Sequence, residues 1–530
     1  MKDRAEAIVL AVDLGTTALK AVLADQAGRT LASASAGYPT FGGREGFAEQ
    51  DPAGWWSAFV NACRALKREE PRAFGSVALV AMCGQMHTHV YLDESHRPLR
   101  SAISWMDQRS APIVEELKGD ADAAATIKEE TANAVTATYT APNLLWVQRN
   151  DPATWERTRA ILVAKDYVKF LLTGEMTTDP SEAAGTLLFN VAEGRWSRPL
   201  LDLFRVDEAM LPQVAPAAHV IGHVTPGAAE QTALPAGTPV VNGATDNSTA
   251  ALGAGVTESG EATAIIGTAG VISVCSDHPI PDPNDAVVCW NYALANRWIN
   301  LGVMQTAGES LNWFRRAFDA NSAEEKDIFS QYNAMVADVP EGAEGLFFLP
   351  YLNGERSPYW DGDARGVFFG AGLGTTKAHF VRAIMEGVAM ALRNNAETVE
   401  ALGQQITEIR AVGGGLKSRA WLQILSAIME KPIRVIHGGE PSVRGNVALG
   451  MSAIGELGDP AELAKAGEES SSEILEPARE DRFDEHYALF LDLYTQLQPL
   501  FKRRAALVHR ATEPGAPTKG THTPSKEGNP

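Results

Sequence analysis

The feature that most restricts the fold is a hairpin pattern that occurs twice, nearly half the chain apart. Two apolar, strand-like runs flank a short turn in residues 8–24 and again in residues 262–275, and the turns contain Gly15-Thr16 and Gly267-Thr268. Runs of this kind joined by a glycine-containing turn predict β-hairpins. Because the two threonines lie 252 positions apart in 530 residues, the repeat predicts two similarly built domains that face one another. Chance recurrence of a common dipeptide is the alternative.

Helices and strands alternate in both halves of the chain. Helical spacing in Trp55–Leu66 precedes a strand-like run, Val77–Met82, and the long helical pattern of His379–Leu402 precedes a strand, Ile406–Val412, and a helix, Arg419–Met429. Such alternation predicts an α/β architecture in which helices cover the sheets. At about 100–200 residues per domain, the length allows two to four domains.

Charge and composition exclude several classes of protein. Lys and Arg number 46 against 66 Asp and Glu, so the net charge is −20, which disfavours nucleic acid or an anionic membrane as a partner. The four cysteines form no C-x-x-C pair, which is typical of a reducing compartment and argues against structural zinc. No apolar run reaches the ~18 residues of a membrane span, and no signal-peptide pattern occurs. We therefore expect a cytoplasmic protein.

The two turns are suited to holding phosphate. Glycine lets the backbone approach a ligand closely, the turn amides point inward, and the hydroxyls of Thr16, Thr17 and Thr268 add donors. Asp13, directly before the first turn, could hold Mg²⁺, and Lys20 could reach a phosphate from the second strand. A hairpin with a surface acid and a surface lysine is the alternative.

Two further segments could serve the same chemistry. Gly413-Gly414-Gly415 lies between a strand and a helix, where a helix N-terminus can bind a nucleotide, although a triple glycine is also an ordinary sharp turn. Asp246 lies in the loop Asn242–Asn247 and could orient and deprotonate an attacking hydroxyl, or else form an Asx-turn or a helix cap. Neither a P-loop nor a G-x-G-x-x-G motif occurs.

Several ordered motifs resemble those of the FGGY family of carbohydrate kinases, and the resemblance extends from Ile8 to about Phe501. The matching segments are Asp13–Thr17, Gly84–His87, Lys165–Tyr167, Ser181–Thr186, Thr245–Asn247, Gly267–Gly270, Phe348–Pro358, Gly366–Gly370 and His379–Glu386. The resemblance implies a duplicated actin/Hsp70-like (ribonuclease H-like) two-domain α/β fold with a central cleft, in which ATP and Mg²⁺ meet a sugar. It also implies a sugar-binding domain over 1–253 and a nucleotide-binding domain over 254–505. Beyond them, a composition rich in Pro, Gly, Thr and Lys without periodicity predicts a disordered tail over 506–530.

The same resemblance assigns roles to individual residues. Asp246 would be the catalytic base, and Asp13 would support the metal ion. The sugar pocket would be formed by Gln85, Met86, His87, Asp246, Asn247 and Trp105, although a core tryptophan is the favoured interpretation of Trp105. The nucleotide would be bound by Thr16, Thr17, Lys20, Gly267, Thr268, Gly308, Asn312, Gly414 and Gly415.

The activity implied by the family is transfer of the γ-phosphate of ATP to a primary hydroxyl of a ketopentose. D-xylulose, giving D-xylulose 5-phosphate, is the leading substrate, and L-ribulose, glycerol and erythritol are alternatives. An actin- or Hsp70-type ATPase that acts on protein partners is a second hypothesis, of a different class. A homodimer is expected by analogy alone.

Three departures from the family pattern affect the substrate assignment. Thr88 and His89 follow the Gln-Met-His segment where glycine is usual, Ala244-Thr245 replaces a glycine-rich approach to Asp246, and Asn143 replaces a lysine. Ordinary drift explains them, or else a side chain at position 88 narrows or repolarises the pocket for another ketopentose or a polyol.

Overall fold

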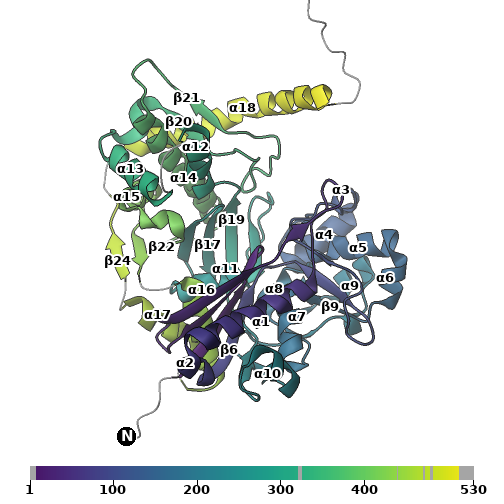
Figure 1. The fold of residues 1–530 in the computed structure, drawn as a ribbon. Coiled ribbons are helices and arrows are strands. Elements are labelled where there is room, and N and C mark those ends of the chain that lie inside the picture. The colour runs from purple at the N-terminus through teal and green to yellow at the C-terminus, as the bar shows by residue number, and fades with distance from the viewer. Residues whose placement is uncertain are drawn as a thin grey trace, which may run out of the picture.

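The protein, described by a computed structural model over residues 7–319, 325–437, 440–456, 458–469, 472–477 and 482–512, forms two lobes (Figure 1). The six-stranded sheet of the N-terminal lobe has the order β14 (Val220–His223), β15 (Pro239–Val241), β6 (Val77–Gly84), β1 (Ile8–Leu14), β2 (Ala18–Ala24) and β3 (Thr30–Gly37). The seven-stranded sheet of the C-terminal lobe has the order β18 (Val288–Asn291), β19 (Trp298–Met304), β17 (Gly270–Ser276), β16 (Glu261–Ile266), β22 (Glu408–Val412), β23 (Ile433–Ile436) and β24 (Ser472–Leu475).

The two sheets share one topology, which confirms the predicted duplication. In each, the hairpin that carries a Gly-Thr turn, β1–β2 or β16–β17, is antiparallel and is extended by a further antiparallel strand, β3 or β19. On the other side of the hairpin, β6 and β15 run parallel to β1, as β22 and β23 run parallel to β16. The arrangement is therefore the two-domain α/β fold that the sequence resemblance implied.

Smaller sheets and the helices surround these two sheets. A five-stranded sheet contains β4 (Thr40–Phe41), β5 (Glu49–Gln50), β8 (Ala102–Ile103), β7 (His89–Leu92) and β9 (Ala160–Val163), and the two-stranded pairs are β10 (Thr177–Thr178) with β13 (Gln213–Val214), β11 (Phe189–Asn190) with β12 (Arg195–Trp196), and β20 (Phe347–Leu349) with β21 (Val367–Phe369). The helices of the N-terminal lobe are α1 (Pro52–Glu69), α2 (Pro71–Gly75), α3 (Ala111–Gly119), α4 (Ala121–Thr131), α5 (Thr140–Asn150), α6 (Pro152–Arg157), α7 (Ala164–Thr173), α8 (Pro180–Ala184), α9 (Arg198–Phe204), α10 (Pro226–Thr232) and α11 (Asp246–Gly253). Those that follow are α12 (Gly308–Phe318), α13 (Glu325–Ala337), α14 (Lys377–Glu400), α15 (Arg419–Met429), α16 (Pro441–Ala453), α17 (Pro460–Glu469) and α18 (Arg482–Thr512).

Local sequence explains where several of these elements begin. Asp51 caps α1 by accepting the backbone N–H of Ala53 at 3.0 Å, and Pro52 occupies the first helical position, where its missing N–H costs nothing. Trp55 and Phe59 on one face of α1 are completely buried in the core of the N-terminal lobe. The helix predicted over Trp55–Leu66 is confirmed and extends to Glu69.

The predicted tail over 506–530 is wrong in its first part. Helix α18 continues to Thr512, because residues 500–512 contain good helix formers and the next proline is Pro514. Residues 513–530 lie outside the described residues. In the part of the chain that the structure describes, no helix combines the length and apolarity needed to cross a bilayer.

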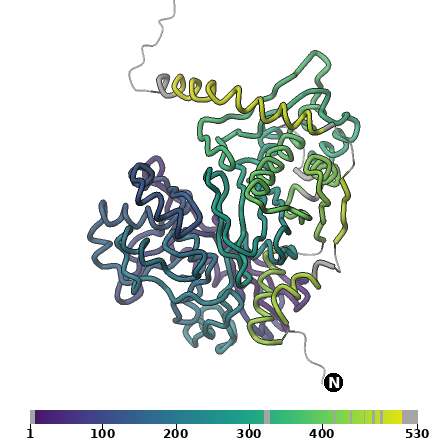
Figure 2. Tube along the Cα trace, turned by 180° about the vertical axis from the view of Figure 1, so that it is seen from behind, coloured from purple at the N-terminus to yellow at the C-terminus, as the bar shows by residue number. Residues whose placement is uncertain are grey.

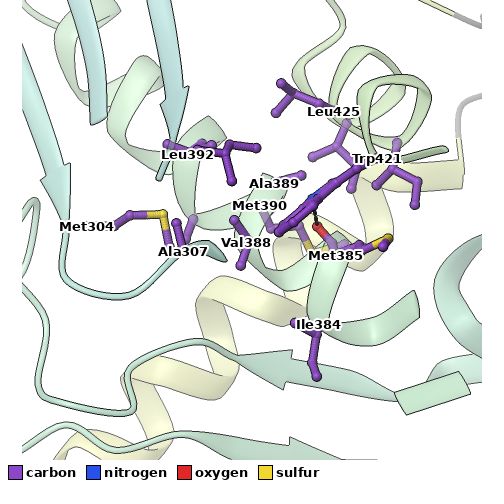
Figure 3. Packing of buried hydrophobic residues seen from close by; sticks show 14 of the residues in the cluster. Met304, Ala307, Ile384, Met385, Val388, Ala389, Met390, Leu392, Trp421 and Leu425 are labelled. Atoms are coloured by element: carbon purple, nitrogen blue, oxygen red, sulfur yellow. Dashed lines mark hydrogen bonds between the residues drawn. The ribbon is translucent and has the colours of Figure 1, made fainter. Parts of the chain in front are cut away.

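The core of the C-terminal lobe lies between its sheet and the helices α14 and α15 (Figure 3). Met385, on α14, accepts a hydrogen bond through its backbone carbonyl from the indole Nε1–H of Trp421 on α15, at 3.1 Å. The bond satisfies the indole nitrogen of a side chain that is otherwise packed among apolar groups.

The lobes meet where α11 and α16 cross (Figure 1). A Cβ atom on Gly253 of α11 would lie 1.8 Å from the carbonyl oxygen of Pro441, and one on Gly445 of α16 would lie 2.0 Å from that of Thr249, so only glycine allows this approach. Asn446 of α16 also donates to the carbonyl of Val12 in β1 at 3.1 Å. Seen from behind, the late helix α16 accordingly lies against the N-terminal strands β1 and β6, and α17 packs on α16 (Figure 2).

Candidate active site

A cavity of about 230 Å³ lies between the two lobes. The N-terminal lobe lines it with Thr16, Gln85, Met86, His87, Trp105, Thr136, Thr138, Tyr139, Asp246 and Asn247. The C-terminal lobe lines it with Ala269, Val271, Val288, Trp290, Leu301, Val303, Arg356, Ser357 and Trp360. The structure thus brings together the six residues proposed for the sugar pocket and one residue, Thr16, of the first Gly-Thr turn; their contacts with a ligand stay a prediction. Trp105 belongs to the cavity wall and is only half-buried.

His87 is held in one orientation and one protonation state. Its backbone has a positive φ of 65°, and its Nδ1 lies 2.6 Å from the carbonyl oxygen of Gly185. Because a carbonyl only accepts, Nδ1 must carry the hydrogen, which leaves Nε2 as an acceptor. Burial lowers the pKa of His87 to about 4, so the ring is neutral near pH 7. A neutral ring with a free acceptor can bind a sugar hydroxyl.

Asp246 is the first residue of α11, and its Oδ1 accepts the backbone N–H of Asn247 at 2.6 Å. Burial raises the pKa of Asp246 to about 7, the charge of Asp13 raises it further, and the backbone amides at the helix start oppose both effects. A carboxylate with a pKa near the working pH is suited to accepting a proton from a hydroxyl. Gly243 allows the loop before Asp246 to pack closely against β6, because a Cβ at position 243 would lie 1.8 Å from the carbonyl oxygen of Met82.

A buried network of charges supports the segment before Asp246. Lys165 donates to Asp179 at 2.9 Å and to the carbonyl of Asn242 at 3.1 Å. Asp179 in turn accepts from the backbone N–H of Ser181 at 2.9 Å, and the Ser181 hydroxyl accepts from the backbone N–H of Thr245 at 3.1 Å. The motifs around Lys165 and Ser181 were predicted only as family matches, and the tertiary structure shows that both hold the Asp246 loop.

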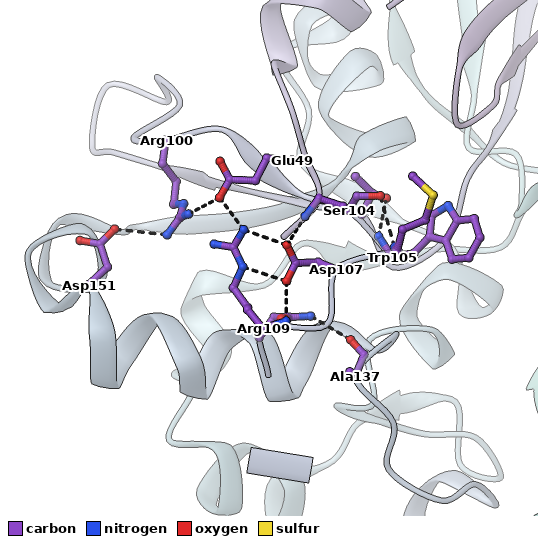
Figure 4. A network of polar contacts seen from close by, with 12 residues as sticks. Glu49, Arg100, Ser104, Trp105, Asp107, Arg109, Ala137 and Asp151 are labelled. Carbon is purple, nitrogen blue, oxygen red and sulfur yellow. Dashed lines mark hydrogen bonds and ion pairs between the residues drawn. The ribbon is translucent and has the colours of Figure 1, made fainter. Parts of the chain in front are cut away.

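A second network fixes the loop that carries Trp105 (Figure 4). Arg109 donates to Asp107 at 2.8 Å and to Glu49 at 2.6 Å, and Glu49 also accepts from Arg100 at 2.6 Å. The guanidinium of Arg109 is completely buried, so the two carboxylates compensate for its desolvation.

Three of the residues that depart from the family pattern, Thr88, His89 and Asn143, do not line the cavity. Thr88 and His89 are both 0% exposed, and neither lines the cavity. His89 instead lies within hydrogen-bonding distance of the His87 carbonyl, at 2.9 Å, and of the Tyr91 hydroxyl, at 3.0 Å. Asn143 donates to the backbone of the loop that contributes Thr136, Thr138 and Tyr139, and so supports the wall from behind. The idea that position 88 narrows the pocket is therefore wrong.

A second cavity, of about 580 Å³, lies within the C-terminal lobe. Six of its lining residues are those proposed for the nucleotide, namely Gly267, Thr268, Gly308, Asn312, Gly414 and Gly415. The others are apolar or aromatic, namely Ile266, Leu311, Phe329, Tyr332, Met385 and Trp421, together with the polar Ser330, Asn333 and Ser418. Helix α12 begins against the second turn, because the N–H of Gly308 donates to the carbonyl of Gly267 at 2.8 Å.

Three residues proposed for the phosphates and the metal ion line neither cavity. Thr17 is exposed, and its carbonyl accepts from Tyr38 at 3.1 Å. Lys20 forms an ion pair with Glu440, at the start of α16. Burial raises the pKa of Asp13, a hydrogen bond from Ser442 opposes this, and Glu440 raises it further. The roles of these residues stay predictions.

Sequence reasoning missed Arg356 and Trp290 as cavity residues. Arg356 lies inside the segment Phe348–Pro358, which matches the family, but the sequence analysis predicts no role for its positive charge. Its guanidinium lies 5.4 Å from the centre of the Trp105 ring, so the two lobes touch across the cavity. Trp290 comes from β18, and no motif marks it.

Comparison with known proteins defines the class. The family model for the N-terminal domain of FGGY carbohydrate kinases matches residues 8–253, and that for the C-terminal domain matches residues 262–454. The chain belongs to the FGGY family of carbohydrate kinases, and it is therefore a sugar phosphotransferase. This assignment decides against the hypothesis of an ATPase that acts on protein partners.

Within the family, the chain is similar to kinases named for more than one substrate. It is 31% identical over 496 residues to the xylulose kinase of Bacillus subtilis, covering 93% of this chain and 97% of the relative. It is 29% identical over 464 residues to the gluconokinase of the same organism, covering 85% and 88%. A solved structure described as a xyloylose kinase from Brucella ovis superposes with a TM-score of 0.85 at 32% identity, covering 93% of this chain and 100% of that one.

Proposed function

We propose that the chain transfers the γ-phosphate of ATP to the 5-hydroxyl of D-xylulose, with Asp246 as the base. The observation that carries the proposal is the position of the second Gly-Thr turn. Thr268 lines the larger cavity and the adjacent residue, Ala269, lines the smaller one, which also contains Asp246. A nucleotide in the larger cavity would therefore present its terminal phosphate towards a hydroxyl that Asp246 orients.

The residues suit an in-line phosphoryl transfer. Asp246 accepts the hydroxyl proton as the sugar oxygen forms its bond to the γ-phosphorus, and the bond from that phosphorus to the bridging oxygen of ADP breaks. The N–H groups of the two turns and the Thr268 hydroxyl donate to the phosphate oxygens and so stabilise the transferring group. Because the transfer requires little covalent help from the protein, orientation of the two substrates supplies most of the rate.

The site also suits Mg²⁺. Burial and then the nearby charge of Glu440 raise the pKa of Asp13, and Asp13 in turn raises the pKa of Asp246, so a cation bound there would be stabilised by nearby carboxylates. Within the described ranges, no three or more His, Cys, Asp or Glu side chains gather as metal ligands. Mg²⁺ commonly binds one or two carboxylates together with phosphates and water, so Asp13 would hold it with the ATP phosphates. When bound, the ion would neutralise charge on the phosphates.

The polar groups of the smaller cavity can bind several hydroxyls of a ketopentose. His87 Nε2 offers an acceptor, and Asn247 and Gln85 offer amides. D-gluconate is a second candidate, since the guanidinium of Arg356 lines the cavity and, among the described residues, has no hydrogen-bond acceptor. A sugar carboxylate would supply one.

A panel of substrates tests the assignment. The enzyme is incubated with MgATP and D-xylulose, L-ribulose, glycerol, erythritol or D-gluconate, and ADP release is measured by a coupled assay. We expect kcat/KM to be highest for D-xylulose, by at least ~10-fold, because a site that bonds each hydroxyl discriminates against analogues that lack one or carry one in another orientation. A preference for D-gluconate would replace the proposed substrate, and no turnover with any of the five would contradict the function.

The pH dependence of the reaction should follow Asp246. Burial raises the pKa of Asp246 to about 7, so a falling pH protonates the base and removes its ability to accept the hydroxyl proton. We expect kcat/KM for the sugar to fall about tenfold per pH unit below a limb near pH 7. Affinity for a non-hydrolysable ATP analogue, measured over the same range, serves as the control. A flat profile down to about pH 5 would argue against this pKa.

A further inference from the structure

A closed ring of hydrogen bonds links the wall of the smaller cavity to the first Gly-Thr turn. Its members are Thr16, Gln50, Gln85, Thr88 and Trp105, all in the N-terminal lobe. Thr16, Gln85 and Trp105 line the cavity, whereas Gln50 and Thr88 do not. Both of these hidden members are 0% exposed, so they act only through the other three.

The first side of the ring passes through Gln50. Its Nε2 donates to the carbonyl of Thr16 at 2.7 Å and to the hydroxyl of Thr40 at 2.8 Å. Its Oε1 accepts from Gln85 at 2.9 Å and from the indole of Trp55 at 3.0 Å. All four hydrogen-bonding positions of the amide are thus used, which fixes the amide in one orientation and holds Gln85 at a constant distance from Thr16.

The second side passes through Thr88 and Trp105. The Thr88 hydroxyl donates to Gln85 Oε1 at 3.2 Å and accepts from the backbone N–H of Trp105 at 3.2 Å. The indole Nε1–H of Trp105 donates to the Thr16 hydroxyl at 3.0 Å. Since that hydroxyl oxygen already accepts a bond, its own hydrogen is free to be donated to a ligand.

We propose that Gln50 and Thr88 are positioning residues that couple occupation of the smaller cavity to the geometry of the first Gly-Thr turn. A sugar that contacts Gln85 and Trp105 restrains two members of the ring. The ring in turn holds Thr16 by its carbonyl, through Gln50, and by its hydroxyl, through Trp105. Sugar binding thereby orders the turn that meets the phosphates, so the two substrates bind cooperatively. This inference rests on the proposed function, because it takes a sugar and ATP as the ligands.

Thr88 allows a matched test. Thr88→Val keeps the shape but removes the hydroxyl, which leaves Gln85 Oε1 and the Trp105 N–H without a partner, whereas Thr88→Ser keeps the hydroxyl. The KM for ATP is measured at low and at saturating D-xylulose, and the ratio of the two values gives the coupling. We expect Thr88→Val to reduce this ratio at least ~3-fold towards 1, and Thr88→Ser to retain it. Equal coupling in the wild type and Thr88→Val, or equal loss in both variants, would overturn the proposal.

A second measurement needs no ligand and separates this inference from the choice of substrate. Hydrogen exchange of the free protein is followed in a peptide that covers residues 14–20. We expect at least ~3-fold faster exchange there in Thr88→Val and in Gln50→Met, but not in Thr88→Ser, since the ring reaches Thr16 from either hidden member. A role confined to local packing would raise exchange only near residues 85–88 and 105, and that result would refute the coupling. If D-xylulose is not turned over, the proposed function fails while this measurement still tests the ring.

Discussion

Replacing Asp246 with asparagine is expected to lower kcat by at least ~10²-fold with little change in sugar affinity, because the amide keeps the shape of the carboxylate but cannot accept the hydroxyl proton. The carboxyl has a pKa raised to about 7 by burial, so in the unmodified protein a substantial fraction is ionised at neutral pH. Steady-state turnover of D-xylulose with MgATP, together with calorimetric titration of the sugar, would check both parts of the expectation.

A matched control is Asp202→Asn, which removes a surface carboxylate whose side chain is 60% exposed and, among the described residues, pairs only with Arg198. We expect that variant to keep the wild-type kcat, since exposed pairs contribute little. Turnover of Asp246→Asn close to that of the control would show that another group accepts the proton.

Replacing Lys165 with methionine is expected to reduce the free energy of unfolding by about 3–5 kcal/mol, the usual effect of breaking a buried ion pair. Burial disfavours the ammonium, but the charges of Asp166, Asp179 and Glu182 outweigh that effect and raise the pKa of Lys165. Without this cation, Lys169, which contacts the buried Asp166 at 2.9 Å, is left as the cation that compensates that carboxylate among the described residues. Urea denaturation followed by circular dichroism measures the difference.

Lys118→Met provides the comparison, because Lys118 and its partner Glu115 are both more than half exposed, at 51% and 77%. That variant should lose at most about 0.5 kcal/mol. We also expect Lys165→Met to lower kcat, since Lys165 holds the carbonyl of Asn242, four residues before Asp246. A stability of Lys165→Met equal to that of Lys118→Met would show that the buried carboxylates are protonated and do not need the cation.

Much of the fold follows from local patterns. The helix Arg419–Met429 has the bounds predicted for it, because Ser418 caps its start. The tail expected to begin at residue 506 is helical as far as Thr512, since residues 506–512 contain no glycine or proline. The parts of the candidate site that lie in local motifs could be predicted, because glycine turns and an acidic loop residue indicate phosphate binding and proton transfer by themselves.

Other parts of the site have no local signal. Gln50 and Trp290 come from strands without a motif. Gln50 is held by Thr16 and Gln85, which are 34 and 35 residues away in the sequence. Trp290 reaches the cavity only because its lobe faces the N-terminal lobe, which lines the other side. Lys20, whose role at a phosphate stays a prediction, forms an ion pair with Glu440, which is 420 positions distant in the sequence.

The sequence by itself determined the two turns, the elements that flank them, the duplicated α/β class and the position of the acidic residue expected to act as base. These depend on backbone conformation and on apolar periodicity, which are properties of neighbouring residues. Only the tertiary structure decided which side chains surround the two cavities, how Asp246 acquires a raised pKa, and how buried amides and charges hold it in place. Burial and charge pairing depend on segments that are distant in the chain and come together only when the lobes fold.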